Sequence, residues 1–407
     1  MLELLPPPPT DPLWDLTAEF AADGRPERLN LVLGVYRDAG GRTPVMAAVR
    51  EAEILLAERS ASKEYRGLSG NAAFNRALLG MVLGSGDADR AAAVQTVAGS
   101  GALRLLADLI CRTRPGTTVW ISDPAYVNHR PILEAAGLRV RPYGWRDADG
   151  GFDAEGVLRE LSGARRDDVV LLQGCCHNPT GVDPSPQDWA ALADLAVRAG
   201  WVPFVDLAYH GLGGGLEADL APTRMLAARV PEMLIAVSCS KNFGLYSDRT
   251  GCAIVLGASG RAVRHAETTL QNAARTLYSM PPEHGAAVVT TILEDERLSA
   301  LWRAEVDVMR GRIAANRTDL TTHLSALGCE PQARSLARQQ GMFSMLPLSP
   351  EQMLRLRRQF AIYGTTSGRI NIAGIPAHRI PFLARGIAGV IGTGVDAGAG
   401  TGAGALA

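Results

Sequence analysis

The sequence predicts an α/β protein built on a mostly parallel sheet. In the middle of the chain, short apolar runs typical of strands alternate with segments of helical periodicity. The apolar runs are nearly continuous, which indicates strands that helices cover on both faces. The chain of 407 residues is long enough for two or three domains.

Apolar runs carry the strand prediction, and helical segments lie between several of them. The expected strands are 118–122, 169–173, 202–206, 234–237 and 252–256. The expected helices are 103–111 and 187–199. Sites in such sheets gather at the carboxyl ends of the strands, where this chain places Cys176 to Asn178, Asp206 and Lys241.

From about residue 259 the pattern becomes helical. Segments 261–277 and 298–327 are long and amphipathic, and we expect the second to bend or break because a helix of that length is unusual. A mixed α/β segment follows, with apolar runs at 341–346 and 368–374. The tail 392–407 is rich in Gly and Ala, which predicts a disordered end.

The composition is that of an ordinary globular protein, with 47% hydrophobic and 20% charged residues and a formal net charge of -1. This charge argues against nucleic acid or an anionic membrane as a partner. No apolar run reaches the roughly 18 residues of a membrane span. The N-terminus lacks the basic and apolar regions of a signal peptide, so we expect a cytoplasmic protein. The six cysteines form no CxxC pair, which favours reduced, buried thiols over a metal site.

Lys241 is the most informative residue of the chain. It follows the apolar run 234–237 and lies within the sequence SCSKNFGLY. Burial of a lysine at the end of a core strand lowers its pKa, and the neutral amine is a nucleophile toward aldehydes. The alternative is a lysine at a strand end whose amine reaches solvent.

Four further segments carry polar groups that suit a small charged ligand. The small-residue loop 98–104 opens a helix whose N–H groups suit a phosphate, although turns of this kind are common. Asn178 is held extended before Pro179, so its amide can point into a site. Asp206 needs a partner at its buried strand end, either a protonated pyridine nitrogen or a nearby arginine. Arg249 could bind a phosphate or form a surface ion pair.

In their order and spacing, these segments resemble the fold-type I pyridoxal-phosphate enzymes, and more narrowly the class I aspartate/aromatic amino acid aminotransferase family. The resemblance extends from about Asp11 to Val390. Its most specific stretches are YRGLSG (65–70), HNPTG (177–181), SKNFGLY (240–246), YSMPP (278–282) and SGRINIAG (367–374).

The resemblance implies a large domain with a mostly parallel seven-stranded sheet and a smaller α/β domain built from both chain ends. The N-terminal arm and part of the small domain would occupy residues 1–44. The large cofactor-binding domain would follow at 45–310, the rest of the small domain at 311–391, and the low-complexity tail at 392–407.

The resemblance also implies pyridoxal 5'-phosphate as the cofactor, and it implies a role for each matching residue. Lys241 would bind the cofactor covalently and then move a proton, and Asp206 would keep the pyridinium nitrogen protonated. Tyr209 and Asn178 would hydrogen-bond the 3-oxygen of the ring. The phosphate would be held by Gly99, Ser100, Ser238, Ser240 and Arg249. His129 would lie on the ring face, and Tyr126 and Asn178 would lie beside both the ring and the substrate. Arg369 would bind the substrate α-carboxylate. Gly34 would belong to a mobile segment that closes over the substrate.

Members of this family share their active sites across a dimer. Tyr65 would therefore reach the phosphate of the neighbouring subunit, and Arg275 would receive a distal carboxylate of the neighbour's substrate. A two-fold homodimer is expected on this ground.

The sequence departs from the family pattern mainly around the substrate. Tyr126 stands where the family usually has Trp, Glu64 replaces a neutral Asn, Arg66 replaces an apolar residue, and Met280 replaces a small polar residue. An extra acid near Arg275 would weaken its attraction for a dicarboxylate, and Met280 would add an adaptable apolar wall. The alternative is neutral drift, with Glu64 and Arg66 as a compensating surface ion pair.

Three functions follow as hypotheses. The first is an aminotransferase that moves an amino group between an aromatic, acidic or specialised L-amino acid and a 2-oxo acid by ping-pong chemistry. The second is an elimination or substitution enzyme that uses the same cofactor on a specialised biosynthetic amino acid. The third is a non-catalytic binding module, which the retained Lys241 and Asp206 disfavour.

Overall fold

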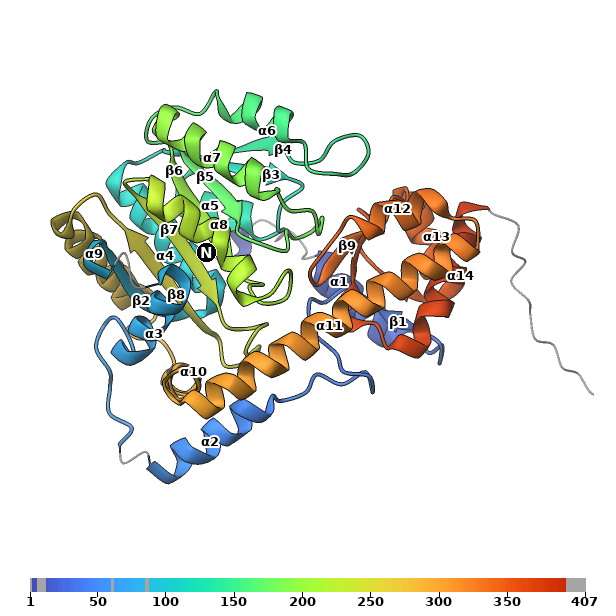
Figure 1. The fold of residues 1–407 in the computed structure, drawn as a ribbon, viewed down its shortest axis with the longest axis horizontal. Helices are drawn as coiled ribbons and strands as arrows, with labels where there is room; N and C mark the ends of the chain where they lie inside the picture. Colours follow the sequence, from blue (N-terminus) through green and yellow to red (C-terminus); the bar gives the residue numbers. More distant parts are fainter. Residues whose placement is uncertain (1, 6–11, 60–61, 85–87, 393–407) are drawn as a thin grey trace, which may run out of the picture.

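The computed structural model describes residues 2–5, 12–59, 62–84 and 88–392. A sheet of seven strands forms its centre (Figure 1), in the order β2-β8-β7-β6-β5-β3-β4. Strand β8 is antiparallel to both of its neighbours, and the other pairs are parallel. The prediction of an α/β fold with a mostly parallel sheet is confirmed. The strands are β2 (Ala91–Val97), β3 (Thr118–Asp123), β4 (Arg139–Gly144), β5 (Val169–Gln173), β6 (Val202–Leu207), β7 (Met233–Ser238) and β8 (Thr250–Leu256).

Helices cover both faces of this sheet, as the continuous apolar strands predicted. In β5, Val169 and Leu171 belong to a hydrophobic cluster with α4, α5 and α9, whereas Val170 and Leu172 belong to a cluster with α3, α7 and α8. The helices that precede β8, the last strand of this sheet along the chain, are α1 (Pro12–Ala22), α2 (Ala47–Arg59), α3 (Ala72–Leu83), α4 (Ala98–Thr113), α5 (His129–Ala135), α6 (Ala154–Leu161), α7 (Pro186–Ala199) and α8 (Leu216–Arg229). Those after it are α9 (Gly260–Leu277), α10 (Glu283–Glu294), α11 (Glu296–Ala326), α12 (Glu330–Ala337), α13 (Pro350–Phe360) and α14 (Ile380–Ile391).

Helix α11 differs from the expectation, because it continues without interruption over 31 residues. It packs against α2 and α10 and also against α12 and α14, so partners stabilise it along its length (Figure 1). It crosses the expected domain limit at residues 310 and 311. The domain limits themselves stay a prediction. Of the expected tail 392–407, residues 393–407 lie outside the described residues.

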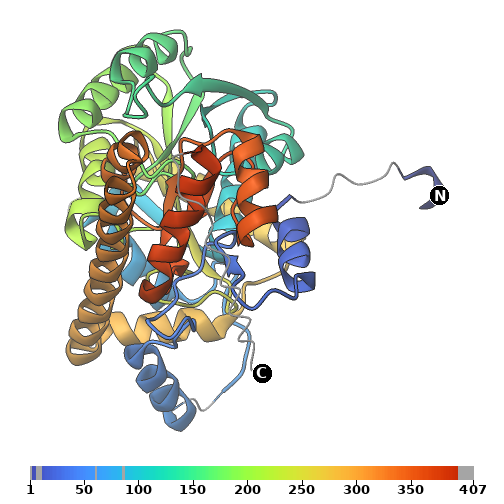
Figure 2. The same cartoon turned by 90° about the vertical axis from the view of Figure 1, so that its right-hand side faces the viewer.

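Two small sheets join segments from opposite ends of the chain. Strand β1 (Leu29–Asn30) pairs in parallel with β10 (Ile362–Tyr363), and β9 (Phe343–Met345) pairs with β11 (Arg369–Asn371) in the antiparallel direction. Helix α1 lies beside this C-terminal part of the fold in both views (Figures 1 and 2). In the described residues, no helix is both long enough and apolar enough to cross a membrane.

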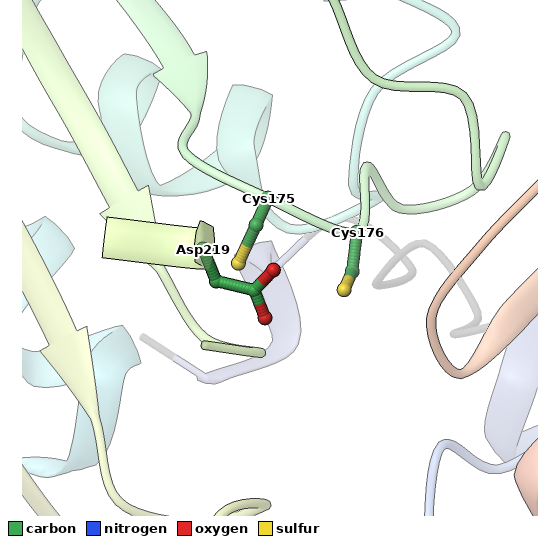
Figure 3. Close-up of side chains that lie close together, drawn as sticks. All are labelled: Cys175, Cys176 and Asp219. Carbon is green, nitrogen blue, oxygen red and sulfur yellow. The ribbon is translucent and has the colours of Figure 1, made fainter. Parts of the chain in front are cut away.

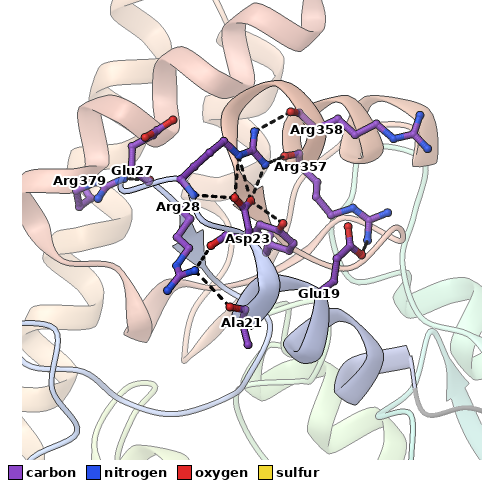
Figure 4. A network of polar contacts seen from close by, with 10 residues as sticks. Glu19, Ala21, Asp23, Glu27, Arg28, Arg357, Arg358 and Arg379 are labelled. Carbon is purple, nitrogen blue, oxygen red and sulfur yellow. Dashed lines mark hydrogen bonds and ion pairs between the residues drawn. The ribbon is translucent and has the colours of Figure 1, made fainter.

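A polar network fastens the N-terminal segment to the C-terminal part (Figure 4). Arg25 forms an ion pair with Asp23 at 2.6 Å and donates hydrogen bonds to the carbonyl oxygens of Arg357 and Arg358 at the end of α13. Carbonyl groups at a helix end lack partners within the helix, so a guanidinium stabilises them. The hydroxyl of Tyr363 also donates to Asp23, at 2.8 Å.

We predict that Arg25→Ala lowers the melting temperature in a pH-dependent way. Hydrogen bonds from Arg25 hold the pKa of Asp23 well below its usual range. A carboxylate with a lowered pKa stabilises the fold above its unfolded pKa of about 4, and this contribution is lost as the pH falls. The difference in melting temperature from the wild type should therefore be larger at about pH 7 than at about pH 2.5, where the folded state also begins to take up the proton.

The matched control for this prediction is Arg385→Ala, which removes an exposed arginine on α14. It should change the melting temperature little at either pH. An Arg25→Ala effect of equal size at both pH values would contradict the assigned role of the ion pair.

Candidate active site

The predicted cofactor-binding residues gather at one edge of the central sheet. Strands β5, β6 and β7 end at this edge, where Asn178, Asp206 and Lys241 follow or complete them. Strand β2 runs parallel to β7 because both are antiparallel to β8. The first turn of α4, with Gly99 and Ser100, therefore opens at the same edge.

Asp206 is a buried carboxylate, 6% exposed, at the end of β6. Its Oδ2 lies 2.8 Å from Nε2 of His129, which begins α5. The second ring nitrogen of His129, Nδ1, is buried without a hydrogen-bond partner. The described structure thus gives Asp206 a histidine partner, where the sequence left an arginine or a pyridine nitrogen open.

Lys241 has the environment that was predicted for it. Burial lowers the pKa of its amine to about 8, while the charge of Asp206 opposes that decrease. Its Nζ lies 4.8 Å from the centre of the Tyr209 ring. Asn178 donates a hydrogen bond from Nδ2 to the Tyr209 hydroxyl at 3.0 Å, and burial raises the pKa of that hydroxyl well above its usual value. Since the amine titrates near neutral pH, it can take up and release protons there.

Three side chains and a close backbone approach form a cradle beside the lysine. The Ser238 hydroxyl donates to that of Ser240 at 3.1 Å. Arg249 donates to the Ser240 hydroxyl at 3.5 Å and to the carbonyl of Tyr246 at 2.8 Å, and it forms no ion pair with any described residue. A Cβ on Gly99 would lie 2.9 Å from that of Ser238. Only glycine leaves this space open at the start of α4, where the backbone N–H groups suit an anion.

Arg369, on β11, is 4% exposed and has no carboxylate partner in the part of the chain that the structure describes. One nitrogen donates to the Val32 carbonyl at 2.6 Å, another lies 3.5 Å from Oδ1 of Asn178, and Nε is buried without a partner. The guanidinium lies 4.7 Å from the centre of the Phe343 ring. The same ring leaves no room for a side chain at Gly34. A buried guanidinium of this kind suits a carboxylate ligand.

Tyr126 lies among these charged groups. Its ring contacts that of His129 edge-on, with 5.2 Å between the centroids. Burial raises the pKa of its hydroxyl, and the charge of Asp206 adds to that increase. Tyr126 therefore lies beside His129 and close enough to Asp206 to be affected by its charge.

Two predicted residues lie apart from this group within the single chain. Tyr65 is 91% exposed, and Arg275 is exposed near the end of α9, where it contacts the Ser279 hydroxyl. The structure also differs from the suggested pairing of Glu64 with Arg66. Arg66 instead forms an ion pair with Glu283 at 3.1 Å, because the start of α10 lies closer to it than its sequence neighbour does.

Comparison with known proteins agrees with this geometry. The model of the family described as aminotransferase class I and II matches residues 26–387. The chain belongs to this family. It is 41% identical to an aspartate aminotransferase of Salmonella typhi over 396 residues, which cover 96% of the chain and 100% of the relative. It is 42% identical to an aromatic-amino-acid aminotransferase of Paracoccus denitrificans over 389 residues, covering 95% and 99%.

A solved structure gives the same result for the aminotransferase fold. The aromatic-amino-acid aminotransferase of Burkholderia pseudomallei, covalently bound to pyridoxal phosphate, superposes with a TM-score of 0.93 at 36% identity. The match covers 96% of this chain and 99% of that one. The cofactor of this aminotransferase is therefore pyridoxal phosphate, as predicted.

The residues at the sheet edge fit that cofactor. The cradle of Ser238, Ser240 and Arg249 with the start of α4 offers hydroxyl, guanidinium and backbone donors to a phosphate. Lys241 offers a buried amine, and Asp206 offers a buried carboxylate to a protonated ring nitrogen.

Sequence reasoning assigned no role to a second layer behind this aminotransferase site. His177 is fully buried, its ring nitrogens lie 2.9 Å from the Ser122 hydroxyl and 2.8 Å from that of Thr180, and its ring stacks on Trp145. Burial holds the pKa of His177 well below its usual value. The layer supports the turn that carries Asn178. In the sequence, the HNPTG motif was the signal for this layer, because it contains His177. Ser122 and Trp145 lie too far from His177 in the sequence for their contacts with it to be predicted.

The adjacent thiols of Cys175 and Cys176 lie beside Asp219 behind the site (Figure 3). The Asp219 carboxylate accepts backbone hydrogen bonds from Gly211, Gly213 and Gly214 at 2.7 to 2.9 Å. A hydrogen bond from Cys176 and burial raise the pKa of Cys175, and burial raises that of Cys176 to about 11. Through its hydrogen bonds, the Asp219 carboxylate supports the backbone of residues 211–214.

We predict that Gly99→Ala weakens cofactor binding by about 5- to 100-fold, because its Cβ would press on Ser238 and move the cradle. The affinity of the apoenzyme for pyridoxal phosphate, measured by fluorescence titration, would test this. Gly80→Ala is the matched control, since an added Cβ at Gly80 on α3 meets nothing within 4 Å. Equal affinities of the two variants would contradict the cradle.

Proposed function

We propose that this aminotransferase moves an amino group between glutamate or 2-oxoglutarate and a second substrate pair of aromatic, acidic or specialised character. The observation that supports it most directly is the buried Lys241 amine, which lies over Tyr209 with the charge of Asp206 nearby and the unpaired guanidinium of Arg369 in reach of Asn178. The assembly combines a proton carrier, a cofactor site and a carboxylate site.

In this proposal, the chain supplies the proton transfer and the cofactor supplies the electron sink at the substrate Cα. Lys241 would move the proton between the substrate Cα and C4′ of the cofactor. A pKa of about 8 suits an amine that exchanges protons near neutral pH. Asp206 holds a proton on the ring nitrogen of the cofactor, and His129 orients the carboxylate through the 2.8 Å contact. Tyr209, with Asn178 bound to its hydroxyl, donates to the 3-oxygen of the ring.

Arg369 orients the substrate in this scheme. Its Nε is buried without a partner, so a substrate α-carboxylate would complete its hydrogen bonds as a bidentate pair. The contact from Arg369 to the Val32 carbonyl links the guanidinium to the segment around Gly34. Binding of the carboxylate would thereby be coupled to closure of that segment.

We also propose a cytoplasmic homodimer with shared active sites. Tyr65 and Arg275 are exposed in the single chain, and a partner subunit would cover them. Tyr65 would then reach the partner's cofactor phosphate, and Arg275 would bind a distal carboxylate of the partner's substrate. The proposal requires neither nucleic acid nor a membrane.

The second substrate is left broad for two reasons. The named relatives include aspartate, aromatic-amino-acid and tyrosine aminotransferases at similar identity. Glu64 is exposed and is not neutralised by Arg66, which pairs with Glu283. If Glu64 lies near Arg275 in a dimer, it would weaken the attraction for acidic substrates relative to aromatic ones.

The first test is the half-reaction. We predict that single L-amino acids, added to the holoenzyme without any 2-oxo acid, convert the visible absorption of the lysine-bound cofactor to that of its amino form. The conversion should occur with glutamate and with an aromatic or acidic donor. Turnover that continues without any 2-oxo acid would instead indicate elimination or substitution chemistry and would refute the proposal.

We predict that Arg275→Ala lowers kcat/KM for acidic donors by about 10- to 100-fold, since it removes charge-assisted hydrogen bonds to the distal carboxylate. Aromatic donors should change by less than about threefold. Arg261→Ala is the matched control, because Arg261 is an exposed arginine at the other end of α9. A parallel loss for both substrate classes would argue against a role in distal carboxylate binding.

A further inference from the structure

A second cavity lies at the opposite edge of the sheet from the cofactor site. It has a volume of about 430 Å³ and is bounded by the starts of β3, β4 and β5, together with the turns that precede them. The proposed active-site residues lie at the other ends of the parallel strands. The cavity is therefore separate from the active site and takes no part in the proposed reaction.

Arginines dominate the lining of this cavity. They are Arg114, Arg139, Arg141, Arg165 and Arg166. Asp168 lies in the lining and Asp167 beside it, so the group holds five positive and two negative charges. The chain as a whole has a net charge of -1, so this concentration of positive charge is local.

The nearby acids leave most of this charge uncompensated. Asp167 pairs with Arg114 at 3.4 Å, and both side chains are largely exposed. Oδ2 of Asp168 accepts hydrogen bonds from Trp120 Nε1 at 3.2 Å and from the Arg165 backbone N–H at 2.9 Å. Among the described residues, no carboxylate lies within ion-pairing distance of the other four guanidinium groups. All five arginines are exposed and line one cavity, so an anion bound there would meet several positive charges at once.

One guanidinium is already oriented. That of Arg141 lies 4.3 Å from the centre of the Trp120 ring, an arrangement that cation–π attraction stabilises. The hydrogen bond from Trp120 to Asp168 in turn fixes the indole. Orientation of this kind reduces the entropy that a ligand must overcome.

Protection of a sheet edge is the simpler explanation, and it accounts for only part of the cluster. Strand β4 is an edge strand, and charged residues on an edge discourage pairing with another chain. Arg139 and Arg141 lie on β4, but Arg114 belongs to the turn before β3, and Arg165 and Arg166 belong to the turn before β5. Edge protection does not explain why three separate segments bring arginines to one cavity.

We propose that this arginine cavity binds a small polyanion that carries two or more phosphate groups. Each guanidinium can donate two parallel hydrogen bonds to a phosphate, and guanidinium groups from three segments can hold more than one phosphate. The volume lies in the range of small-molecule sites. A concave site of this size favours a small ligand over the extended backbone of a nucleic acid.

The test is calorimetric titration of the holoenzyme with inorganic pyrophosphate, while the visible absorption of the cofactor is recorded. We expect saturable binding with one site per chain and no change in absorption, because the cofactor lies at the other edge of the sheet. Arg139→Gln with Arg165→Gln should weaken binding at least about tenfold. The lysine pair, Arg139→Lys with Arg165→Lys, should bind with intermediate affinity, because it keeps the charge and loses the guanidinium fork.

The matched control is Arg334→Gln with Arg385→Gln, which removes two exposed arginines on α12 and α14 and changes the net charge equally. It should alter the affinity by less than about twofold. Equal weakening in the control, no saturable binding, or a cofactor spectrum that shifts with the binding curve would overturn the proposal. So would tighter binding of a single-stranded oligonucleotide that pyrophosphate does not displace. Melting temperatures of all variants would confirm that each is folded.

Discussion

The buried carboxylate of Asp206 is the charge on which the rest of the site depends. A carboxylate at the end of a core strand is stable only if donors surround it, and the described structure supplies His129 at 2.8 Å. The end of β6 and the start of α5 must therefore keep their relative position. The same charge opposes the desolvation of Lys241 and keeps its pKa near neutral pH. Burial of the amine thus lowers the proton affinity of Lys241, and the Asp206 carboxylate limits that decrease.

The substrate side of the site depends on contacts of a different kind. Arg369 comes from β11, Val32 from the N-terminal segment and Phe343 from β9, and they meet only because the small sheets join the two ends of the chain. The network around Arg25 and Asp23 fastens the same two ends together. Helix α11 packs against elements on both sides of the molecule. The cofactor side is therefore held by the central sheet, and the carboxylate side by long-range pairing.

The two edges of the sheet carry opposite chemical arrangements. At one edge, the buried side chains of Asp206 and Arg369 lie with Lys241, and the Nε of Arg369 has no hydrogen-bond partner among the described residues. At the other edge, the arginines line an open cavity with few acids nearby. The net charge of the chain conceals this asymmetry, because positive and negative residues balance only over the whole molecule. The net charge of the chain therefore gave no sign of this basic surface.

The sequence by itself determined the fold class, because short apolar runs such as 169–173 and 202–206 alternate with helical segments and are typical of strands covered on both faces. It also pointed to Lys241 and Asp206, since polar residues that complete or closely follow such runs lie at one edge of the sheet. It did not predict β4, because an edge strand such as Arg139–Gly144 is exposed and lacks an apolar run.

Only the tertiary structure decided the pairings. It gave Asp206 a histidine, gave Arg66 the partner Glu283, kept α11 continuous and brought five arginines to one cavity. Each of these joins residues far apart in sequence or depends on packing against distant elements. Local periodicity and motif spacing carry no information about such contacts, because they arise only when the sheet has formed and its connecting segments have closed over it.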